Sequence, residues 1–140
     1  MNERYLFRGK RVDSHEWIEG HLSKGRLLGY EGNSLQPCID REVGGVMITS
    51  VVDPATVGQC TGLRDKDGAL VFEGDILQEN RDPVPFIYQV GWFAGNMVLF
   101  VRDNINGDIR PSCSNHMVPY CGIIGNFHEN PELMKGGEDA

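Results

Sequence analysis

The chain has 140 residues, of which 40% are hydrophobic, and a formal net charge of −7 at pH 7. This length fits one ordinary domain, and this apolar fraction suffices for a packed core, which excludes a disordered chain. The negative charge repels phosphate backbones on average, so binding of nucleic acid would need a local basic patch. No apolar run approaches the ~20 residues that cross a bilayer, and the first residues lack the apolar segment of a signal peptide. We therefore expect a protein of the cytoplasm, with no membrane contact.

The first third of the chain is predicted to form short strands separated by turns. Alternating residues place Tyr5 and Phe7 on one face of a first strand, and residues 17–22 resume as its hairpin partner. Another short strand is expected at 27–30. Residues 31–45 give no clear pattern, although 35–39 have the composition of a strand. Residues 46–52 are rich in β-branched side chains and bounded by turns, which predicts a buried strand.

Residues 52–76 carry the clearest turn signals in the chain. Asp53-Pro54 predicts a single helical turn, because the aspartate can cap free amides and the proline suits the first helical position. The run Asp65-Lys66-Asp67-Gly68 predicts a tight reversal, since Asp-Gly is among the strongest short hairpin signals. Residues 73–76 then lead into a new strand.

The last half is predicted to contain strands at 75–79, 86–93, 97–102 and 122–127. Alternation in 86–93 places Trp92 on the same face as Phe86, Tyr88 and Val90, and so assigns it to the core. Residues 97–102 are apolar on both faces, so this strand should be central. A loop or second small hairpin is expected at 103–111, and a short helical turn fits within 112–121. Asn130-Pro131 repeats the cap-plus-proline signal, with one helical turn through Leu133.

Short strands at regular spacing, joined by glycine-rich turns, predict an all-β protein built as a small barrel or sandwich. We expect a single domain over residues 1–133, followed by a disordered tail at 134–140.

Three segments also carry a resemblance to a known family. Residues 52–76 resemble the central pattern of the YopX family, small proteins encoded by bacteriophages and prophages, and residues 7–10 with 17–20 and 124–133 extend the likeness. The resemblance implies an SH3-like barrel, which we place at 53–130, with additional N-terminal strands at 1–52 and one or two short helical turns. It also implies a phage or prophage origin and a bacterial host. The family has no established molecular function that could be transferred to this chain.

Metal binding is considered because cysteine and histidine occur together. Cys113, His116 and Cys121 lie within nine residues, but a structural zinc site needs a fourth ligand, from Cys38, Cys60 or His128. The favoured interpretation is unrelated free thiols, as expected in a reducing compartment, and a surface imidazole. Asp65, Asp67 and Glu73 faintly resemble a calcium loop, yet apolar residues interrupt the alternating ligand positions, so the hairpin is favoured. We predict no cofactor and no metal.

No nucleophile motif accompanies the four histidines, and paired carboxylates cannot be told from solvated ones among twenty acidic residues. We therefore name no catalytic residue and predict a non-enzymatic protein-interaction or oligomerisation module, with a protein partner or further copies of itself. Its contact surface would combine a polar loop held by glycines with an aromatic strand edge. The candidate binding residues are Trp17, Thr61, Arg64, Asp65, Lys66 and Asp67.

Two alternatives remain open at this point. A nucleic-acid-binding accessory protein would use the only dense basic cluster, which acidic residues interrupt. That cluster consists of Arg4, Arg8, Lys10 and Arg11. A metal-dependent enzyme is the third hypothesis.

Overall fold

The computed structural model describes residues 5–25, 36–80, 84–93, 96–103, 108–112 and 115–135. Within these ranges the chain consists of antiparallel strands joined by tight turns and short 3-10 helices, so the all-β prediction is confirmed. The chain divides into two compact units, residues 1–60 and 61–140, which are described one at a time. The predicted single domain over 1–133 stays a prediction.

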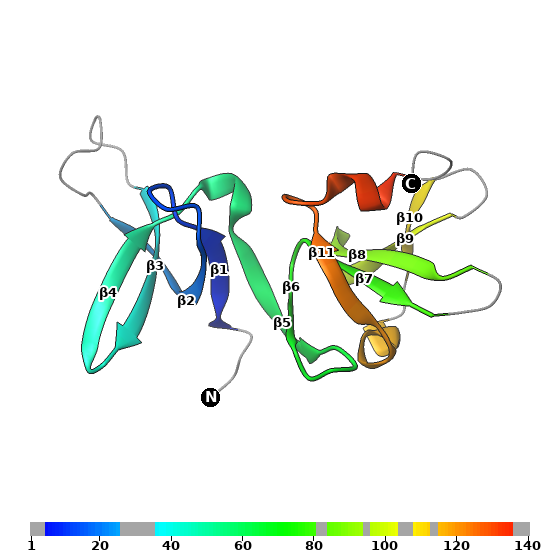
Figure 1. Ribbon diagram of the computed structural model, residues 1–140, viewed down its shortest axis with the longest axis horizontal. Coiled ribbons are helices and arrows are strands. Elements are labelled where there is room, and N and C mark those ends of the chain that lie inside the picture. Colours follow the sequence, from blue (N-terminus) through cyan, green and yellow to red (C-terminus); the bar gives the residue numbers. More distant parts are fainter. Residues whose placement is uncertain are drawn as a thin grey trace. The chain divides into compact units, whose positions relative to one another are not determined.

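The N-terminal unit is an antiparallel sheet of strands of different lengths, in the order β4-β3-β2-β1-β5 (Figure 1). Its strands are β1 (Phe7–Lys10), β2 (Trp17–Gly25), β3 (Gln36–Val43), β4 (Val46–Val51) and the first residues of β5 (Gly58–Arg64). The predicted first hairpin is confirmed, since Phe7 lies opposite Gly20 and Lys10 opposite Trp17. The strand expected at 27–30 lies outside the described residues.

The core of this unit is formed by Ile18, Ile39 and Val52, with Phe7 and Val57 packed against them. The edge strand β4 corrects one prediction. The segment 46–52 is not a buried strand: β4 is an edge strand, and the side chain of Val46 is 61% exposed. Only the end of the segment, at Ser50 to Val52, is buried. Composition shows that these residues suit a strand, but not whether a neighbouring strand covers them.

The helical turn predicted at Asp53-Pro54 is confirmed as the 3-10 helix η2 (Pro54–Thr56). One carboxylate oxygen of Asp53 accepts a hydrogen bond from the amide of Ala55 at 3.0 Å, as expected of a cap. The hydroxyl of Thr56 is buried, donates to the Asp53 carbonyl and accepts from the Lys10 amide at 2.9 Å. This hydroxyl ties η2 to β1.

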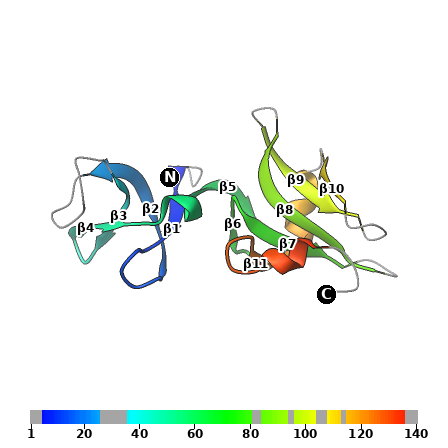
Figure 2. The ribbon, with the colours of Figure 1, turned by 90° about the horizontal axis from the view of Figure 1, so that it is seen from above.

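The C-terminal unit contains the rest of β5, then β6 (Leu70–Phe72), β7 (Asp75–Glu79), β8 (Phe86–Phe93), β9 (Asn96–Arg102), β10 (Ile109–Ser112) and β11 (Gly122–Asn126). Its main sheet has the order β10-β9-β8-β7-β11 (Figure 2). The central position predicted for 97–102 is confirmed, because β9 lies between β8 and β10. The helical turn expected within 112–121 is confirmed as the 3-10 helix η3 (Asn115–Tyr120), and β10 forms the second hairpin partner of β9.

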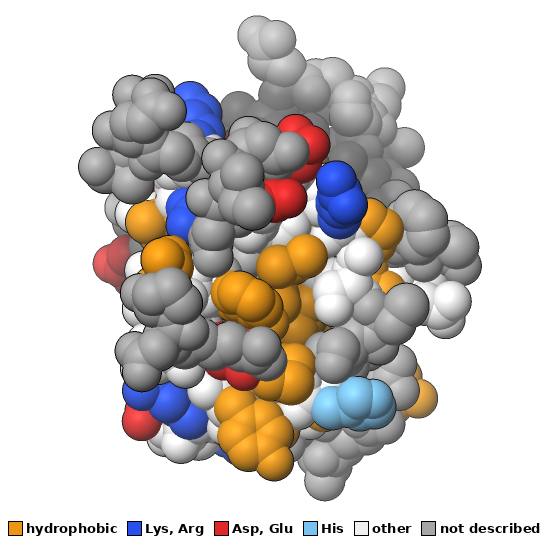
Figure 3. Space-filling model, turned by 90° about the vertical axis from the view of Figure 1, so that its right-hand side faces the viewer, with side chains coloured by type: hydrophobic (Ala, Val, Ile, Leu, Met, Phe, Trp, Pro, Cys, Tyr) orange, Lys and Arg blue, Asp and Glu red, His pale blue; other side chains and the backbone are white. Residues whose placement is uncertain are grey.

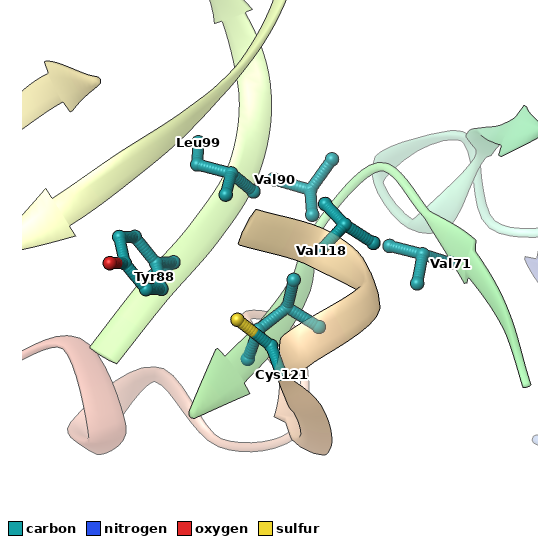
Figure 4. Packing of buried hydrophobic residues seen from close by; sticks show 7 residues of the cluster. Val71, Tyr88, Val90, Leu99, Val118 and Cys121 are labelled. Atoms are coloured by element: carbon teal, nitrogen blue, oxygen red, sulfur yellow. The ribbon is translucent and has the colours of Figure 1, made fainter. Parts of the chain in front are cut away.

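Two residues of the η3 segment complete the core of this unit. Val118 and Cys121 lie against side chains from β6, β8 and β9 (Figure 4). The buried set is Val71, Leu77, Tyr88, Val90, Leu99, Val118 and Cys121. The prediction that Trp92 belongs to the core is wrong, since Trp92 is 41% exposed. It pairs with Met97 near the end of the β8–β9 hairpin, beyond the last buried residue of its face.

A third 3-10 helix, η4 (Pro131–Met134), closes the described chain. The predicted turn is confirmed, but the predicted cap is not: the Asn130 side chain makes no capping bond and instead accepts from the Asn126 amide at 3.3 Å. Met134, the first residue of the predicted tail, is buried beside Ile76 and Ile87, while 136–140 lie outside the described residues.

Neither sheet closes into a barrel among the described strands, so the SH3-like barrel is not confirmed.

On the side that lies to the right in Figure 1, apolar side chains gather near the middle with charged ones around them (Figure 3). None of the described helices is both long enough and apolar enough to cross a membrane.

Candidate functional site

Residues 64–68, which we call the Asp65 turn, reverse the chain between β5 and β6. The Asp65 amide donates to the Ala69 carbonyl at 2.9 Å, and the Gly68 amide donates to the Asp65 carbonyl at 3.0 Å. Gly68 has φ +86°, a value that L side chains rarely adopt. The tight reversal predicted from Asp67-Gly68 is therefore confirmed.

The carboxylate of Asp65 is buried and organises this turn from inside. Its Oδ1 accepts from the amides of Asp67 and Ala69, each at 2.9 Å, and its Oδ2 accepts from the Ile123 amide at 3.2 Å. Burial by itself raises the pKa of Asp65, but the amides of Ala69, Ile123 and Asp67, with a smaller contribution from the Lys66 charge, outweigh it. The pKa of Asp65 therefore lies below its usual value, and the group is ionised at neutral pH.

The turn is also attached to the outer edge of β11 through backbone. The Lys66 amide donates to the Cys121 carbonyl at 2.9 Å, two residues before the Ile123 amide that reaches Asp65. Alternate residues of a strand point their backbone groups to the same edge, so the turn covers the start of β11 like a short extra strand. Arg64, Lys66 and Asp67 are left with exposed side chains.

An open cleft of about 260 Å³ lies beside this attachment, within the C-terminal unit. It is lined by Lys66, Asp67, Gln78, Asn80, Gly122, Ile123 and Ile124. A β-carbon at Gly122 would lie 2.9 Å from Cε of Lys66, so the absence of a side chain there lets the lysine lie across the start of β11. The register of β11 against β7 shifts between Ile123 and Gly125, and Ile124 at this bulge is 39% exposed.

The cleft offers several kinds of contact in a small space. Lys66 supplies a cation and Asp67 an anion, while the side-chain amide of Gln78 donates to that of Asn80 at 3.1 Å. These amides keep further donors and acceptors, and Ile124 adds one apolar contact. Such a set can bind a polypeptide segment through hydrogen bonds and charge.

The six residues predicted for binding have different environments. Thr61 is buried, and its hydroxyl oxygen accepts from the Leu63 amide at 3.0 Å, while Asp65 is the internal anchor already described. The exposed side chains of the turn are those of Arg64, Lys66 and Asp67, and one guanidinium nitrogen of Arg64 donates to the Gly68 carbonyl at 2.8 Å. The turn thus contains Asp65, which holds its conformation, together with residues whose side chains are exposed.

Trp17 belongs to the N-terminal unit and is half-buried. The guanidinium carbon of Arg8 lies 5.0 Å from the centre of a Trp17 ring, which is the geometry of a cation–π contact. Arg11 of the predicted basic cluster bonds to Asp13 at 2.8 Å, and Arg4 lies outside the described residues.

The sequence interpretation missed three residues that line the cleft, Gln78, Asn80 and Ile124. The pairing of β7 with β11 joins segments that are distant in the chain, and no local sequence signal indicates this pairing.

The zinc hypothesis concerned Cys113, His116 and Cys121. Cys113 lies outside the described residues, His116 is exposed, and the thiol of Cys121 is buried 3.1 Å from the Met117 carbonyl. Among the described side chains there is no group of three or more His, Cys, Asp or Glu placed to hold a metal ion.

Comparisons with known proteins give a family and a fold. The model of the family described as YopX protein matches residues 6–135. A search of curated proteins finds no match. Among solved structures, the chain is similar to protein EF1440 from Enterococcus faecalis, with 22% identity and a TM-score of 0.52 over 92% of this chain and 96% of that chain. At this identity the likeness concerns the fold alone.

Proposed function

The chain belongs to the YopX protein family, and we propose that it is a non-enzymatic protein-interaction module whose Asp65 turn and adjoining cleft contact a partner polypeptide. A phage or prophage origin and action in the cytoplasm of a bacterial host are part of the same proposal.

One observation supports this proposal: exposed side chains belong to a turn whose conformation is held by hydrogen bonds to a buried carboxylate. Three backbone amides bond to the buried Asp65 carboxylate, and the Lys66 amide adds a fourth link to β11. A surface held in one conformation before binding loses less conformational entropy when a partner arrives. The anchoring therefore favours a contact role for Lys66 and Asp67 over a purely structural turn.

The chemistry of the cleft favours an extended peptide segment as the occupant. The amides of Gln78 and Asn80 can both donate to and accept from peptide groups. Lys66 and Asp67 would pair with opposite charges on the partner, and Ile124 would contact an apolar side chain. Charges at such a rim govern specificity and the rate of association more than total affinity.

We also propose that the C-terminal unit has the arrangement of an SH3-like barrel left open on one side. Two observations support it: a 3-10 helix, η3, directly precedes the last strand, and the link from Lys66 to Cys121 brings the end of β5 to the start of β11. Binding residues are often carried by loops that a rigid scaffold holds in position.

Charge reversal at the turn tests the binding proposal. Full-length protein carrying Lys66→Glu is compared with the wild type and with Lys135→Glu, which reverses another exposed lysine of the same unit. Each is immobilised and exposed to nuclease-treated bacterial extract, and the protein that the wild type retains is identified, purified and titrated. We expect Lys66→Glu to weaken its binding at least tenfold, about 1.4 kcal/mol, and Lys135→Glu to leave it unchanged.

Equal binding by Lys66→Glu and Lys135→Glu would contradict the proposed surface. A partner that the wild type retains from untreated extract but not from nuclease-treated extract would instead support the nucleic-acid hypothesis, since phosphate contacts then supply the affinity.

A further inference from the structure

From Val46 to Ser50, strand β4 lacks the protection against pairing that the two edge strands of the C-terminal sheet have in the described part of the chain. At one edge of the C-terminal sheet, β10 contains Arg110 and Pro111, and at the other edge the Asp65 turn and a bulge cover β11. Charges, proline, bulges and covering loops are the usual means by which proteins block edge-to-edge association. β4 has the sequence VMITSV and pairs with β3 without any register shift. Among the described residues, a neighbouring segment bonds to its outer side only at its last residue, Val51, through Val12.

The turn before β4 determines which of its backbone groups point outward. Gly44 and Gly45 have φ +59° and +83°, as a two-residue type I′ turn requires, and this makes Val43 and Val46 a hydrogen-bonded pair. By alternation, the backbone groups of Val46, Ile48 and Ser50 point to β3, and those of Met47, Thr49 and Val51 point to the outer edge.

Two hydrogen bonds at the end of β4 confirm this alternation. The Val52 amide donates to Pro37 of β3 at 3.1 Å, while the Val51 carbonyl, on the outer side, accepts from the Val12 amide at 3.1 Å. Within the part of the chain that the structure describes, Met47 and Thr49 therefore present their N–H and C=O groups on an edge to which no strand is bonded.

The side chains around this edge are apolar and exposed. Exposed fractions are 48% for Val43, 61% for Val46, 60% for Met47 and 39% for Ile48. Neighbouring exposed apolar side chains of this kind mark surfaces that bind protein. An exposed strand edge with an apolar surround is suited to the addition of another strand.

We propose that β4 pairs antiparallel with β4 of a second copy about a two-fold axis, with Ile48 opposite Ile48 and Met47 opposite Thr49. In this register each of the two symmetric Met47–Thr49 pairs exchanges two N–H···O bonds, so every outward group of both residues is used. Centring the pair on Thr49 would place Met47 against Val51, whose carbonyl is already bonded to Val12.

Charge favours a second copy over another partner. The molecule carries a net charge of −7, which opposes self-association, yet β4 has no charged side chain, so two copies meet here without like charges face to face. A charged partner would find no complementary group on this edge. The proposed dimer rests on the self-association part of the proposed function and places it at β4, apart from the Asp65 turn. The test of the β4 surface can therefore fail while the test of the Asp65 turn succeeds, and the reverse.

The size of the contact sets the strength expected. One pair of six-residue strands buries an area at the low end of specific interfaces, so the dimer should be weak and depend on protein concentration.

Sedimentation velocity over a series of concentrations of the full-length protein tests the proposal. We expect the wild type to pass from monomer to dimer as concentration rises to about 1 mM, at the weak end of specific association. Ile48→Lys places two like charges opposite each other at the two-fold axis and should reduce dimerisation at least tenfold. Leu22→Lys is the matched control, because Leu22 is 38% exposed but lies on β2, and it should dimerise like the wild type.

A mixture of Ile48→Lys and Ile48→Glu gives the sharpest result. Each variant alone should be monomeric, whereas the mixture should recover dimers, because opposite charges then face each other across the axis. This recovery also shows that both variants are folded. A wild type that remains monomeric throughout, Ile48→Lys dimerising like the wild type, or no recovery in the mixture would each overturn the proposal, whatever the outcome at Lys66.

Discussion

Replacing Asp65 with asparagine changes one side-chain atom at the centre of the candidate site. The remaining amide oxygen can still accept from Asp67 and Ala69, but the new NH2 group faces the Ile123 amide, donor against donor. One hydrogen bond to a charged acceptor is lost, and the other two become neutral bonds. A bond to a charged group contributes about 1.5–3 kcal/mol, so the free energy of unfolding should fall by about 2–4 kcal/mol at pH 7.

The effect should depend on pH in a defined direction. The pKa of Asp65 is lower in the folded protein than its usual value, so this group stabilises the fold above the pKa of the unfolded chain and loses that contribution as pH falls through the folded pKa. The difference in stability between the wild type and Asp65→Asn should therefore be full at pH 7 and shrink in acid, below the ordinary aspartate value of about 3.9.

Urea unfolding followed by circular dichroism gives the stability at each pH, and hydrogen exchange of the Ile123 and Lys66 amides reports on the turn itself. Asp67→Asn is the control, because the Asp67 side chain is exposed; its effect should stay within about 0.5 kcal/mol. Equal stability of the two variants, or a difference that does not diminish in acid, would refute the account of Asp65 as the anchor.

Two further predictions concern buried hydroxyl groups. Thr56→Val keeps the shape but removes the oxygen that accepts from Lys10, and should lower the stability by about 1–3 kcal/mol, whereas Thr56→Ser retains most of it; thermal unfolding measures both. Tyr88→Phe removes the O–H that donates to the buried Glu79 carboxylate at 2.8 Å, with a similar expected loss in urea unfolding. Tyr5→Phe, at an exposed position, should change nothing, and a Tyr88→Phe protein as stable as the wild type would contradict the role given to this bond.

Local signals predicted the turns and most strands because the residues that determine them are adjacent in the chain. Asp53-Pro54 and Asp67-Gly68 act over a few residues, through a cap and a positive φ, and both turns form as expected. At Asn130 the same cap rule predicted the turn but not the bond, since the side chain bonds to Asn126 instead.

Exposure and the cleft could not be predicted in this way. Periodicity tells which side chains share a face, as for Trp92, but not where the elements that cover this face end. The cleft depends on the pairing of β7 with β11, which brings Gln78 beside Gly122, and no pattern near either residue indicates that contact.

The contact role of the Asp65 turn is tested most directly by crosslinking in living bacterial cells. A photoreactive amino acid is placed at position 66 in one protein and at position 135 in another, both exposed positions of the same unit. Our account predicts a crosslink from position 66 to a defined protein that position 135 does not give. The same products from both positions, or crosslinks from position 66 to nucleic acid alone, would contradict it.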